Sequence, residues 1–203
     1  MSLIDHKDME QGRATRRKLI KLLALTSTVS SLDLFGPLKK MGFGKEGDMT
    51  LEEMREKAIQ LFKKPKQFHW SMATLAVGQE KLGKKDWQVV KAMSAFAGGL
   101  GSNGEVCGAL IGALATMGLK FSREQEEGKE DRRMWGNTRE LLKRFREEIV
   151  QNHSGIRCRE IAGVDWRNRE EVASFFNGEK FLECARIVGD TAKLTGELLE
   201  RQT

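Results

Sequence analysis

Residues 98–112 read GGLGSNGEVCGALIG, a glycine-dense run that leads directly into an apolar segment. Glycine tolerates positive φ and allows close backbone approach, which residues with a Cβ rarely do. The run therefore predicts a tight loop that leads into a helix over about residues 104–118. Because this helix is apolar almost all round, we expect it to be the buried, central helix of the fold.

A cysteine, Cys107, lies in the first turn of this predicted helix. The free N–H groups and the positive dipole end of a helix N-terminus favour thiolate over thiol. Thiolate is the form of cysteine that binds metals and attacks disulfides. The position of Cys107 therefore indicates a metal ligand or a thiol with a lowered pKa.

The same run contains a G-x-G-x-x-G pattern at Gly99, Gly101 and Gly104. This pattern binds dinucleotides where it joins a strand to a helix in a βαβ unit. Here the preceding residues are predicted to be helical, so we expect no nucleotide cofactor. Gly104, Gly108 and Gly112 are spaced by four and would instead let a neighbouring helix approach closely.

Helical patterns continue on both sides of this stretch. The sequence TLEE at residues 50–53 is a capping box that opens a helix through about Phe62. Further helices are expected over residues 68–82, 86–96, 122–151 and 169–201. Because no internal repeat and no credible strand is evident, the prediction is all-α, a single compact multi-helix bundle.

Residues 1–45 are expected to form a basic N-terminal arm with a linker, and residues 46–203 the helical domain. The sequence TRRKLIK at residues 15–21, followed by a short apolar stretch, is similar to a twin-arginine export signal. The alternative is an amphipathic helix whose basic face docks on the body or on a partner. The protein would be periplasmic in the first case and cytoplasmic in the second.

The composition excludes several classes of protein. No apolar run reaches the roughly 18 residues that a membrane-spanning helix needs. The net charge of +6 is spread along the 203 residues. Nucleic acid binding would need a basic face with stacking aromatics, and none is evident, so nucleic acid is not an expected partner.

The chain has three cysteines, Cys107, Cys158 and Cys184, which lie far apart and form no C-x-x-C pair. This spacing excludes a thioredoxin motif, a zinc ribbon, a bacterial ferredoxin run and covalently attached haem c. Three scattered cysteines are more often inert core residues than a site. The residues around them decide between these interpretations.

Each of the three cysteines lies in a distinctive short motif. The sequence CGALIG at residues 107–112 follows AGGLG at residues 97–101, and the two later cysteines lie in IRCREIAG at 156–163 and ECARIV at 183–188. Three such motifs in this order resemble the C-GCAxxG-C-C family of redox-active proteins, over about residues 51–199. The resemblance implies a helical domain with a four-cysteine site, related to domains of split-Soret-type cytochromes that are associated with iron–sulfur binding.

The chain departs from the family pattern at the first cysteine. In the matching stretch FHWSMATL, residues 68–75, Trp70 stands where that cysteine would be. Three thiolates cannot complete the four-ligand set of an iron–sulfur cluster unless another group joins them. His69, beside the lost position, is the predicted fourth ligand, and His153 is the second candidate. The glycine loop is predicted to direct backbone N–H groups at the cofactor, which would lie against Gly99, Gly101, Gly104 and Gly108.

Three functions stay open. The leading prediction is a redox-associated metal or iron–sulfur binding protein, which transfers electrons beside a partner protein and uses Cys107, Cys158 and Cys184 as ligands. In the second, Trp70 fills the former cavity and the chain is a metal-free helical adaptor or scaffold subunit. In the third, Cys107 is a low-pKa nucleophile and one of the other cysteines resolves it.

No catalytic triad, paired-carboxylate site or P-loop is evident, so the protein is not expected to be a complete enzyme on its own. We expect a homodimer or a subunit of a larger complex. Trp135 and Trp166 lie in highly charged neighbourhoods and are candidate contacts for a partner.

Overall fold

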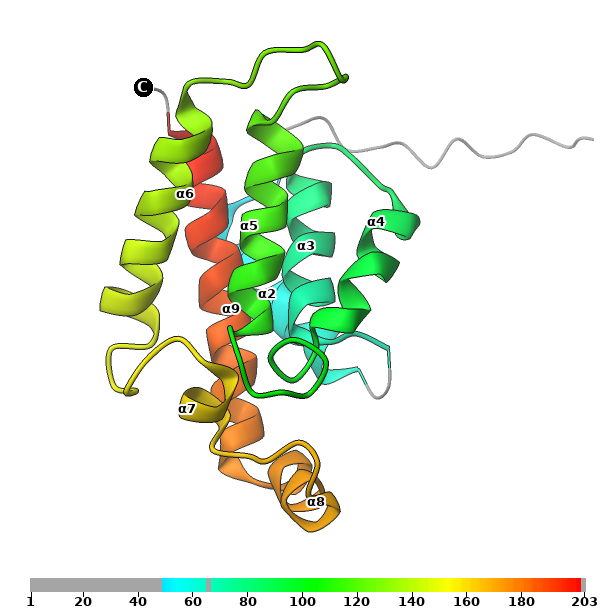
Figure 1. Ribbon diagram of the computed structural model, residues 1–203, viewed down its shortest axis with the longest axis vertical. Helices are drawn as coiled ribbons and strands as arrows, with labels where there is room; N and C mark the ends of the chain where they lie inside the picture. Colours follow the sequence, from blue (N-terminus) through cyan, green and yellow to red (C-terminus); the bar gives the residue numbers. More distant parts are fainter. Residues whose placement is uncertain (1–48, 65–66, 202–203) are drawn as a thin grey trace, which may run out of the picture. The chain divides into compact units, whose positions relative to one another are not determined.

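The computed structural model describes residues 49–64 and 67–201, so the predicted N-terminal arm, its export signal and the domain boundary lie outside the described residues. Apart from one isolated β-bridge between Val106 and Arg157, the ordered elements of this part are helices (Figure 1). The prediction of an all-α bundle is confirmed. The elements are α2 (Leu51–Lys63), α3 (Trp70–Lys81), α4 (Trp87–Ala92), the 3-10 turn η1 (Met93–Phe96), α5 (Gly108–Phe121), α6 (Arg133–Arg144), the π-helical turn η2 (Phe145–Ile149), α7 (Cys158–Ala162), α8 (Arg169–Asn177) and α9 (Glu179–Glu200).

Helix α2 begins at the predicted capping box. The hydroxyl of Thr50 accepts the N–H of Glu53 at 3.2 Å, and the Glu53 carboxylate accepts the N–H of Thr50 at 2.8 Å. One face of α2 is buried, at Met54, Ala58 and Phe62. Residues four apart lie on one side of a helix, so this face packs as a stripe against its neighbours, chiefly α9.

Helices α2 and α9 pack closely because glycine replaces larger residues at their contact. A Cβ built on Gly189 would lie 2.6 Å from a side-chain carbon of Ile59, and one built on Gly196 would lie 2.5 Å from the sulfur of Met54. A Cβ on Gly189 would also lie 3.0 Å from the carbonyl oxygen of Arg55, so the helix spacing requires glycine there. The side chains around Gly196, by contrast, could shift.

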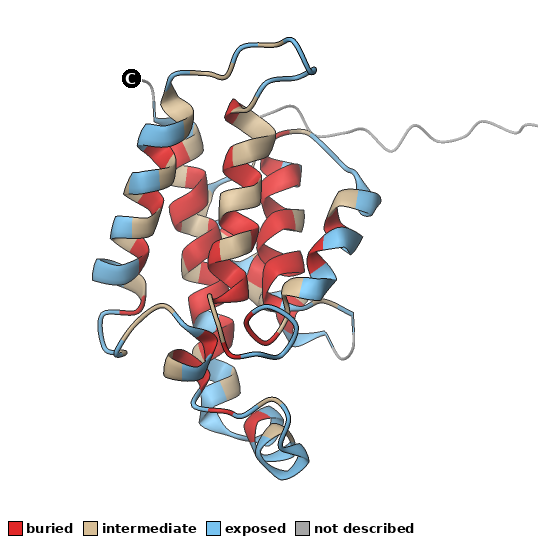
Figure 2. Ribbon diagram, in the orientation of Figure 1, coloured by how far each residue is buried: buried red, intermediate tan, exposed pale blue. Residues whose placement is uncertain are grey.

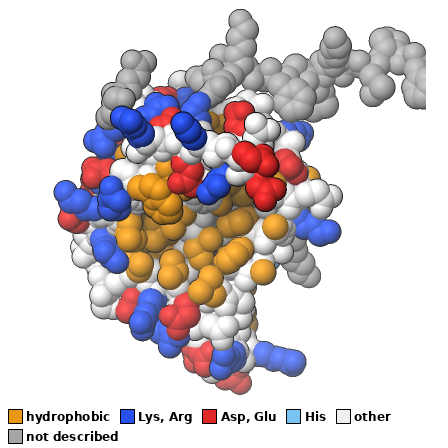
Figure 3. Space-filling model, turned by 45° about the horizontal axis from the view of Figure 1, so that its top comes forward, with side chains coloured by type: hydrophobic (Ala, Val, Ile, Leu, Met, Phe, Trp, Pro, Cys, Tyr) orange, Lys and Arg blue, Asp and Glu red, His pale blue; other side chains and the backbone are white. Residues whose placement is uncertain are grey.

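Helix α3 is the most buried helix of the bundle, with ten of its twelve residues buried (Figure 2). It packs against α5, where a Cβ on Gly112 would collide with the carbonyl oxygen of Ser71. Helix α5 lies between α3, α6 and α9, as expected for the central apolar helix. Its outer side is only partly covered, however, and Figure 3 shows hydrophobic side chains gathered across the middle of this face.

The predicted long helix over residues 122–151 is wrong in its first third. Ser122 ends α5, residues 122–132 form a loop, and α6 begins only at Arg133. The carboxylate of Asp131 accepts the backbone N–H of Arg133 at 2.8 Å and so marks the start of α6. The predicted helix over 169–201 is likewise divided, because Gly178 separates α8 from α9.

Lys81 joins the two ends of the described bundle. Its side chain is 5% exposed, and its ammonium group donates to the carbonyl of Met49 at 2.6 Å and to the carboxylate of Glu200 at 2.5 Å. The start of α2 and the end of α9 therefore meet at one buried cation. Of the helices that the structure describes, none is long and apolar enough to cross a membrane.

A three-cysteine site at one end of the bundle

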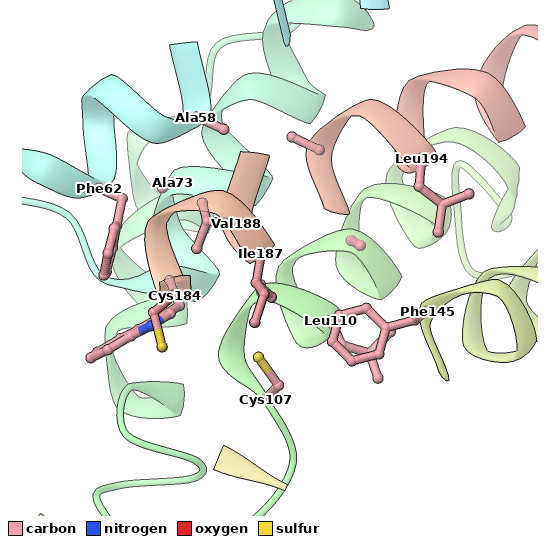
Figure 4. Close-up of a cluster of buried hydrophobic side chains, with 14 of the residues drawn as sticks. Ala58, Phe62, Ala73, Cys107, Leu110, Phe145, Cys184, Ile187, Val188 and Leu194 are labelled. Carbon is pink, nitrogen blue, oxygen red and sulfur yellow. The ribbon is translucent and has the colours of Figure 1, made fainter. Parts of the chain in front are cut away.

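The structure places all three cysteines in one hydrophobic core cluster. Cys107 precedes α5 as its N-cap residue, Cys158 begins α7, and Cys184 lies in the second turn of α9. Each is buried and none forms a disulfide. Cys107 and Cys184 direct their sulfur atoms into the same part of the core (Figure 4). The three motifs, far apart in the sequence, therefore converge in space.

A short antiparallel pairing brings Cys107 and Cys158 to the same side of the backbone. The N–H of Cys107 donates to the carbonyl of Ile156 at 2.9 Å, and the N–H of Cys158 donates to the carbonyl of Glu105 at 2.6 Å. The bridged pair lies between these contacts, and side chains alternate between faces in extended backbone. Both cysteines therefore project to the face opposite the bridged residues, which is the core.

Two tryptophan side chains contact the thiols. The indole nitrogen of Trp166 lies 3.2 Å from the sulfur of Cys158, as a hydrogen-bond donor. Trp70, which is 6% exposed, directs a side-chain hydrogen bond to Cys184. The two indoles meet edge to face, with ring centroids 5.2 Å apart and an interplanar angle of 75°. Trp70 therefore fills the position of the missing cysteine with a bulky N–H donor.

Phenylalanine rings complete an aromatic layer around Trp70. Phe62 and Phe175 lie 5.1 Å and 6.2 Å from Trp70 between ring centroids, and Phe181 contacts Phe62 at 5.0 Å. These rings come from α2, α8 and α9. They surround the indole with apolar atoms, which keeps water from the neighbouring thiols and lowers the local dielectric.

Burial dominates the acidity of the thiols. Burial, and then the nearby Cys158, raise the pKa of Cys107 to about 12, against the opposing effect of the N–H groups of Ala109 and Leu110. Burial, and then Cys107, raise the pKa of Cys184 to about 12. The predicted low-pKa thiolate is therefore wrong, because desolvation outweighs the helix N-terminus. The mutual effects also show that the thiols lie within electrostatic reach of one another.

Burial also raises the pKa of Cys158, and the hydrogen bond from Trp166 opposes that change. An N–H donor stabilises the negative charge on a thiolate. The indole N–H of Trp166, which also lies partly at the surface, therefore favours a thiolate at Cys158.

The glycine loop winds in the left-handed sense. Residues 98–102 all have φ between 58° and 72°, including the non-glycine residues Leu100 and Ser102. A residue with a Cβ pays roughly 1–2 kcal/mol for this conformation. A Cβ on Gly99 would lie 2.7 Å from the Cβ of Cys158, so the loop packs directly onto that cysteine.

The four glycines predicted to face a cofactor have different surroundings. Gly99 packs on Cys158, and a Cβ on Gly108 would lie 3.2 Å from the Cβ of Trp70. Gly104 faces Arg159 and Gly101 has no close side-chain contact below 3.9 Å. Four N–H groups of this segment already have backbone acceptors. Those of Leu100, Ser102, Gly104 and Glu105 donate to the carbonyls of Phe96, Ala97, Gly98 and Gly99, respectively. The predicted donation from this loop to a cofactor stays a prediction.

The two histidine candidates lie beside the site without joining it. His69 is exposed at the N-cap of α3, and its ring stacks with Trp70 at 6.4 Å between centroids. His153 contacts the carboxylate of Glu183 at 3.2 Å, next to Cys184 in the chain. Within residues 49–64 and 67–201, no three His, Cys, Asp or Glu side chains come close enough together to hold a metal ion as they stand.

The residues present do not fit a cluster held by four cysteines, because the chain has only three. Three buried sulfur donors do match the preference of soft metals for thiolate ligands. Sequence reasoning missed Trp166, which was predicted only as a partner contact. Helix α7 ends at Ala162, between Cys158 and Trp166, so their spacing of eight residues does not predict the contact.

Comparison with protein families supports the convergence of the motifs. The family model described as "Putative redox-active protein (C_GCAxxG_C_C)" matches residues 68–198, a range that includes all three cysteines. Searches of curated proteins and of solved structures each found no significant match.

Proposed function

The chain belongs to the C_GCAxxG_C_C family of redox-active proteins, and on this basis we propose that its three cysteines form a redox centre that exchanges electrons with a partner protein. The observation that carries the proposal is the convergence of Cys107, Cys158 and Cys184. They come from three separate segments and are buried together, and Cys158 adds to the raised pKa of both Cys107 and Cys184.

The centre binds a metal ion or an iron–sulfur group through these three sulfurs. A bound cation would offset the repulsion between thiolates that now raises the pKa of Cys107 and Cys184. Such a group would supply one-electron transfer chemistry when bound. Because the chain lacks the family's first cysteine, the fourth ligand comes from outside the chain or from a histidine, for which His69 and His153 are the candidates.

A second function is favoured by Trp70 itself. Its indole fills the core between α2, α8 and α9 and satisfies Cys184 by a hydrogen bond, so the site is complete without a metal. In this case the chain is a metal-free helical adaptor or scaffold subunit. Exposed tryptophans on α4 and α6, Trp87 and Trp135, then offer partner contacts at 55% and 56% exposure. Self-association stays a prediction, as does the compartment.

Metal analysis decides between the two functions. We would measure iron, sulfide and zinc, with a visible spectrum, on full-length protein purified without oxygen. A metal-binding centre predicts stoichiometric metal that is lost in the Cys158→Ala variant. A colourless, metal-free protein would contradict it and support the adaptor.

The Trp70→Cys variant sharpens the result. If the wild type holds no metal but this variant does, the three cysteines are the remainder of a family site. Trp70→Ala is the matched control, because it removes the indole and its bulk about as far as cysteine does without adding a ligand. Metal binding by both variants would show that space alone, rather than the fourth sulfur, limits the site.

A further inference from the structure

A surface groove of about 790 Å³ lies directly beside the three-cysteine site. One wall is the glycine loop, with Leu100 and Asn103, and the other is the segment between α7 and α8, with Trp166 and Arg167. Its volume falls within the range of small-molecule sites. The groove is therefore large enough for a ligand of about the size of a tripeptide.

Trp166 connects the groove to Cys158. The indole lines the groove, and its nitrogen contacts the sulfur of Cys158 at 3.2 Å. Gly99, next to the lining residue Leu100, packs on the Cβ of the same cysteine. Cys158 does not itself line the groove and is 5% exposed, so Trp166 and the glycine loop separate its sulfur from the groove.

The rim of the groove offers a positive charge. Arg159 is paired with the carboxylate of Glu105 at 2.5 Å. Arg167 donates to the side-chain oxygen of Asn103 at 2.5 Å, a neutral partner, and forms no ion pair with any residue in the described part of the chain. Its guanidinium keeps further donors for a carboxylate, to which arginine binds well. Asp165, whose carboxylate accepts the backbone N–H of Arg167 at 3.0 Å, also lines the groove, so among the described lining residues the Arg167 guanidinium is the one group that a carboxylate of a ligand would contact.

The glycine loop over Cys158 should open at a small cost in free energy. Leu100 and Ser102 both hold a positive φ that their side chains disfavour. This strain is released when the loop opens, so it reduces the free energy needed to expose the thiol beneath. Leu100 is also 38% exposed, so little hydrophobic burial holds its side chain in place.

We propose that this groove binds a small disulfide that carries carboxylates, and that the ligand exchanges with Cys158. The sulfur of Cys158, as thiolate, attacks one ligand sulfur, forming a mixed disulfide while the other half leaves as a thiolate and takes up a proton. The sulfur of Cys107 then attacks Cys158, forming a disulfide between these cysteines and releasing the second half as a thiol. Two protein thiols lose two protons and two electrons, and the ligand disulfide is reduced to two thiols.

Cys107 is assigned the second step because the antiparallel pairing places it on the same face of the backbone as Cys158. The inference goes beyond metal binding, since it concerns the reduced, metal-free chain. It is tested in the presence of a chelator, with the metal content measured separately. Failure of the metal proposal therefore leaves its outcome unaffected.

The first experiment maps the entry thiol. Reduced full-length protein is treated with oxidised glutathione, and adducts are located by intact mass and peptide mapping. The wild type should form a Cys107–Cys158 disulfide, whereas Cys107→Ala should accumulate a mixed disulfide on Cys158. Cys184 should stay unmodified in both proteins; Arg139→Gln, on the exposed side of α6, is the control and should behave as the wild type, with circular dichroism verifying the fold of each variant.

A first adduct on Cys107 or Cys184 would overturn the proposal. So would an unchanged rate of adduct formation in Cys158→Ala, or a reaction that occurs only in denaturant.

The second experiment tests the groove. Oxidised glutathione carries carboxylates, whereas cystamine is a cationic disulfide, and the ratio of their rates reports the charge at the entry site. The Arg167→Gln variant should lower this ratio by about two- to fivefold, the size expected of one exposed ion pair. Arg139→Gln, on the exposed side of α6, is the matched control and should leave it unchanged. An equal ratio in all three proteins would overturn the assignment of the groove.

Discussion

Glycine has different structural roles in the helical bundle and in the loop that covers the thiols. In the bundle, Gly112 and Gly189 lie in helices, and their lack of a Cβ lets α3, α5, α2 and α9 approach one another. In the loop, residues 98–102 depend on glycine for positive φ, yet two of these positions carry side chains. The bundle is therefore close-packed and relaxed, whereas the loop is strained. Substitutions at matched positions can separate these two requirements.

The largest effect is expected in the bundle. In Gly112→Ala the new Cβ collides with the carbonyl oxygen of Ser71, which is backbone and cannot rotate away. Overpacking of this kind costs about 3 kcal/mol in the free energy of unfolding, measured by urea denaturation. Gly118→Ala in the same helix is the control, because its Cβ meets nothing within 4 Å. It should stabilise the protein by about 0.5–1 kcal/mol, and similar losses in both variants would contradict the packing argument.

The loop should respond more weakly, but its response should reach the thiol site. Gly99→Ala places a Cβ 2.5 Å from the backbone nitrogen of Glu105 and 2.7 Å from the Cβ of Cys158, at a φ of 72°. We expect a loss of about 2 kcal/mol from strain and overlap together. The loop should also lift, so that Cys158 reacts faster with a maleimide in native buffer. Unchanged labelling alongside the loss of stability would show that the loop does not cover this thiol.

Alkaline pH should destabilise the end of the molecule that holds the buried thiols more than the rest of the bundle. Folding raises the pKa of Cys107 and Cys184 to about 12, above their ordinary value of 9.0, because burial disfavours the charged thiolate. A raised folded pKa stabilises the protein below the unfolded pKa, and this contribution is lost between about pH 9 and 12. Each thiol should remove up to about 1.4 kcal/mol of unfolding free energy per pH unit in this window.

Thermal unfolding of reduced protein at pH 8 and pH 10 measures the effect. The double variant Cys107→Ala, Cys184→Ala should show a shallower decline, although its stability at pH 8 will itself be reduced. Parallel curves for the two proteins would mean that the thiols do not account for the pH dependence.

The smallest effect is expected where strain alone is relieved. Leu100→Gly removes the Cβ from a residue with a φ of 58°, and we expect a gain of about 0.5–1 kcal/mol after the added freedom of the unfolded chain is subtracted. Leu100→Ala keeps the Cβ and should not reproduce the gain. Chemical denaturation of the two variants would provide the comparison, and equal stabilities would place the cost in the exposed leucine side chain instead.

Local signals predicted most of the helices and explain where prediction failed. The capping box at Thr50 and the buried stripe of α2 depend on residues within one or two turns, so the sequence reveals them. The predicted helix over residues 122–132 does not form, because SREQEEGKEDR has no apolar residue with which to pack on the bundle and contains Gly128. Charged residues with good helix propensity cannot hold a helix there without such packing.

Prediction from the sequence reached a different limit at the three-cysteine site. The motifs around Cys107, Cys158 and Cys184 predicted their convergence through the family resemblance, and the structure brings them into one core cluster. Their acidity could not be predicted in this way, because desolvation depends on rings contributed by α2, α8 and α9. The contact between Trp166 and Cys158 also arises from tertiary packing alone.

The cation at Lys81 has a consequence for the connectivity of the chain. Because Met49 and Glu200 share this ammonium group, the two ends of the described bundle are close enough to be joined by a short linker. New termini could then be opened in the charged loop over residues 122–132, which contributes little to the core. Such a circular permutant should keep the same helix contacts in a different chain order, with its new termini at the α5–α6 loop, leaving the segments that carry the three cysteines uncut.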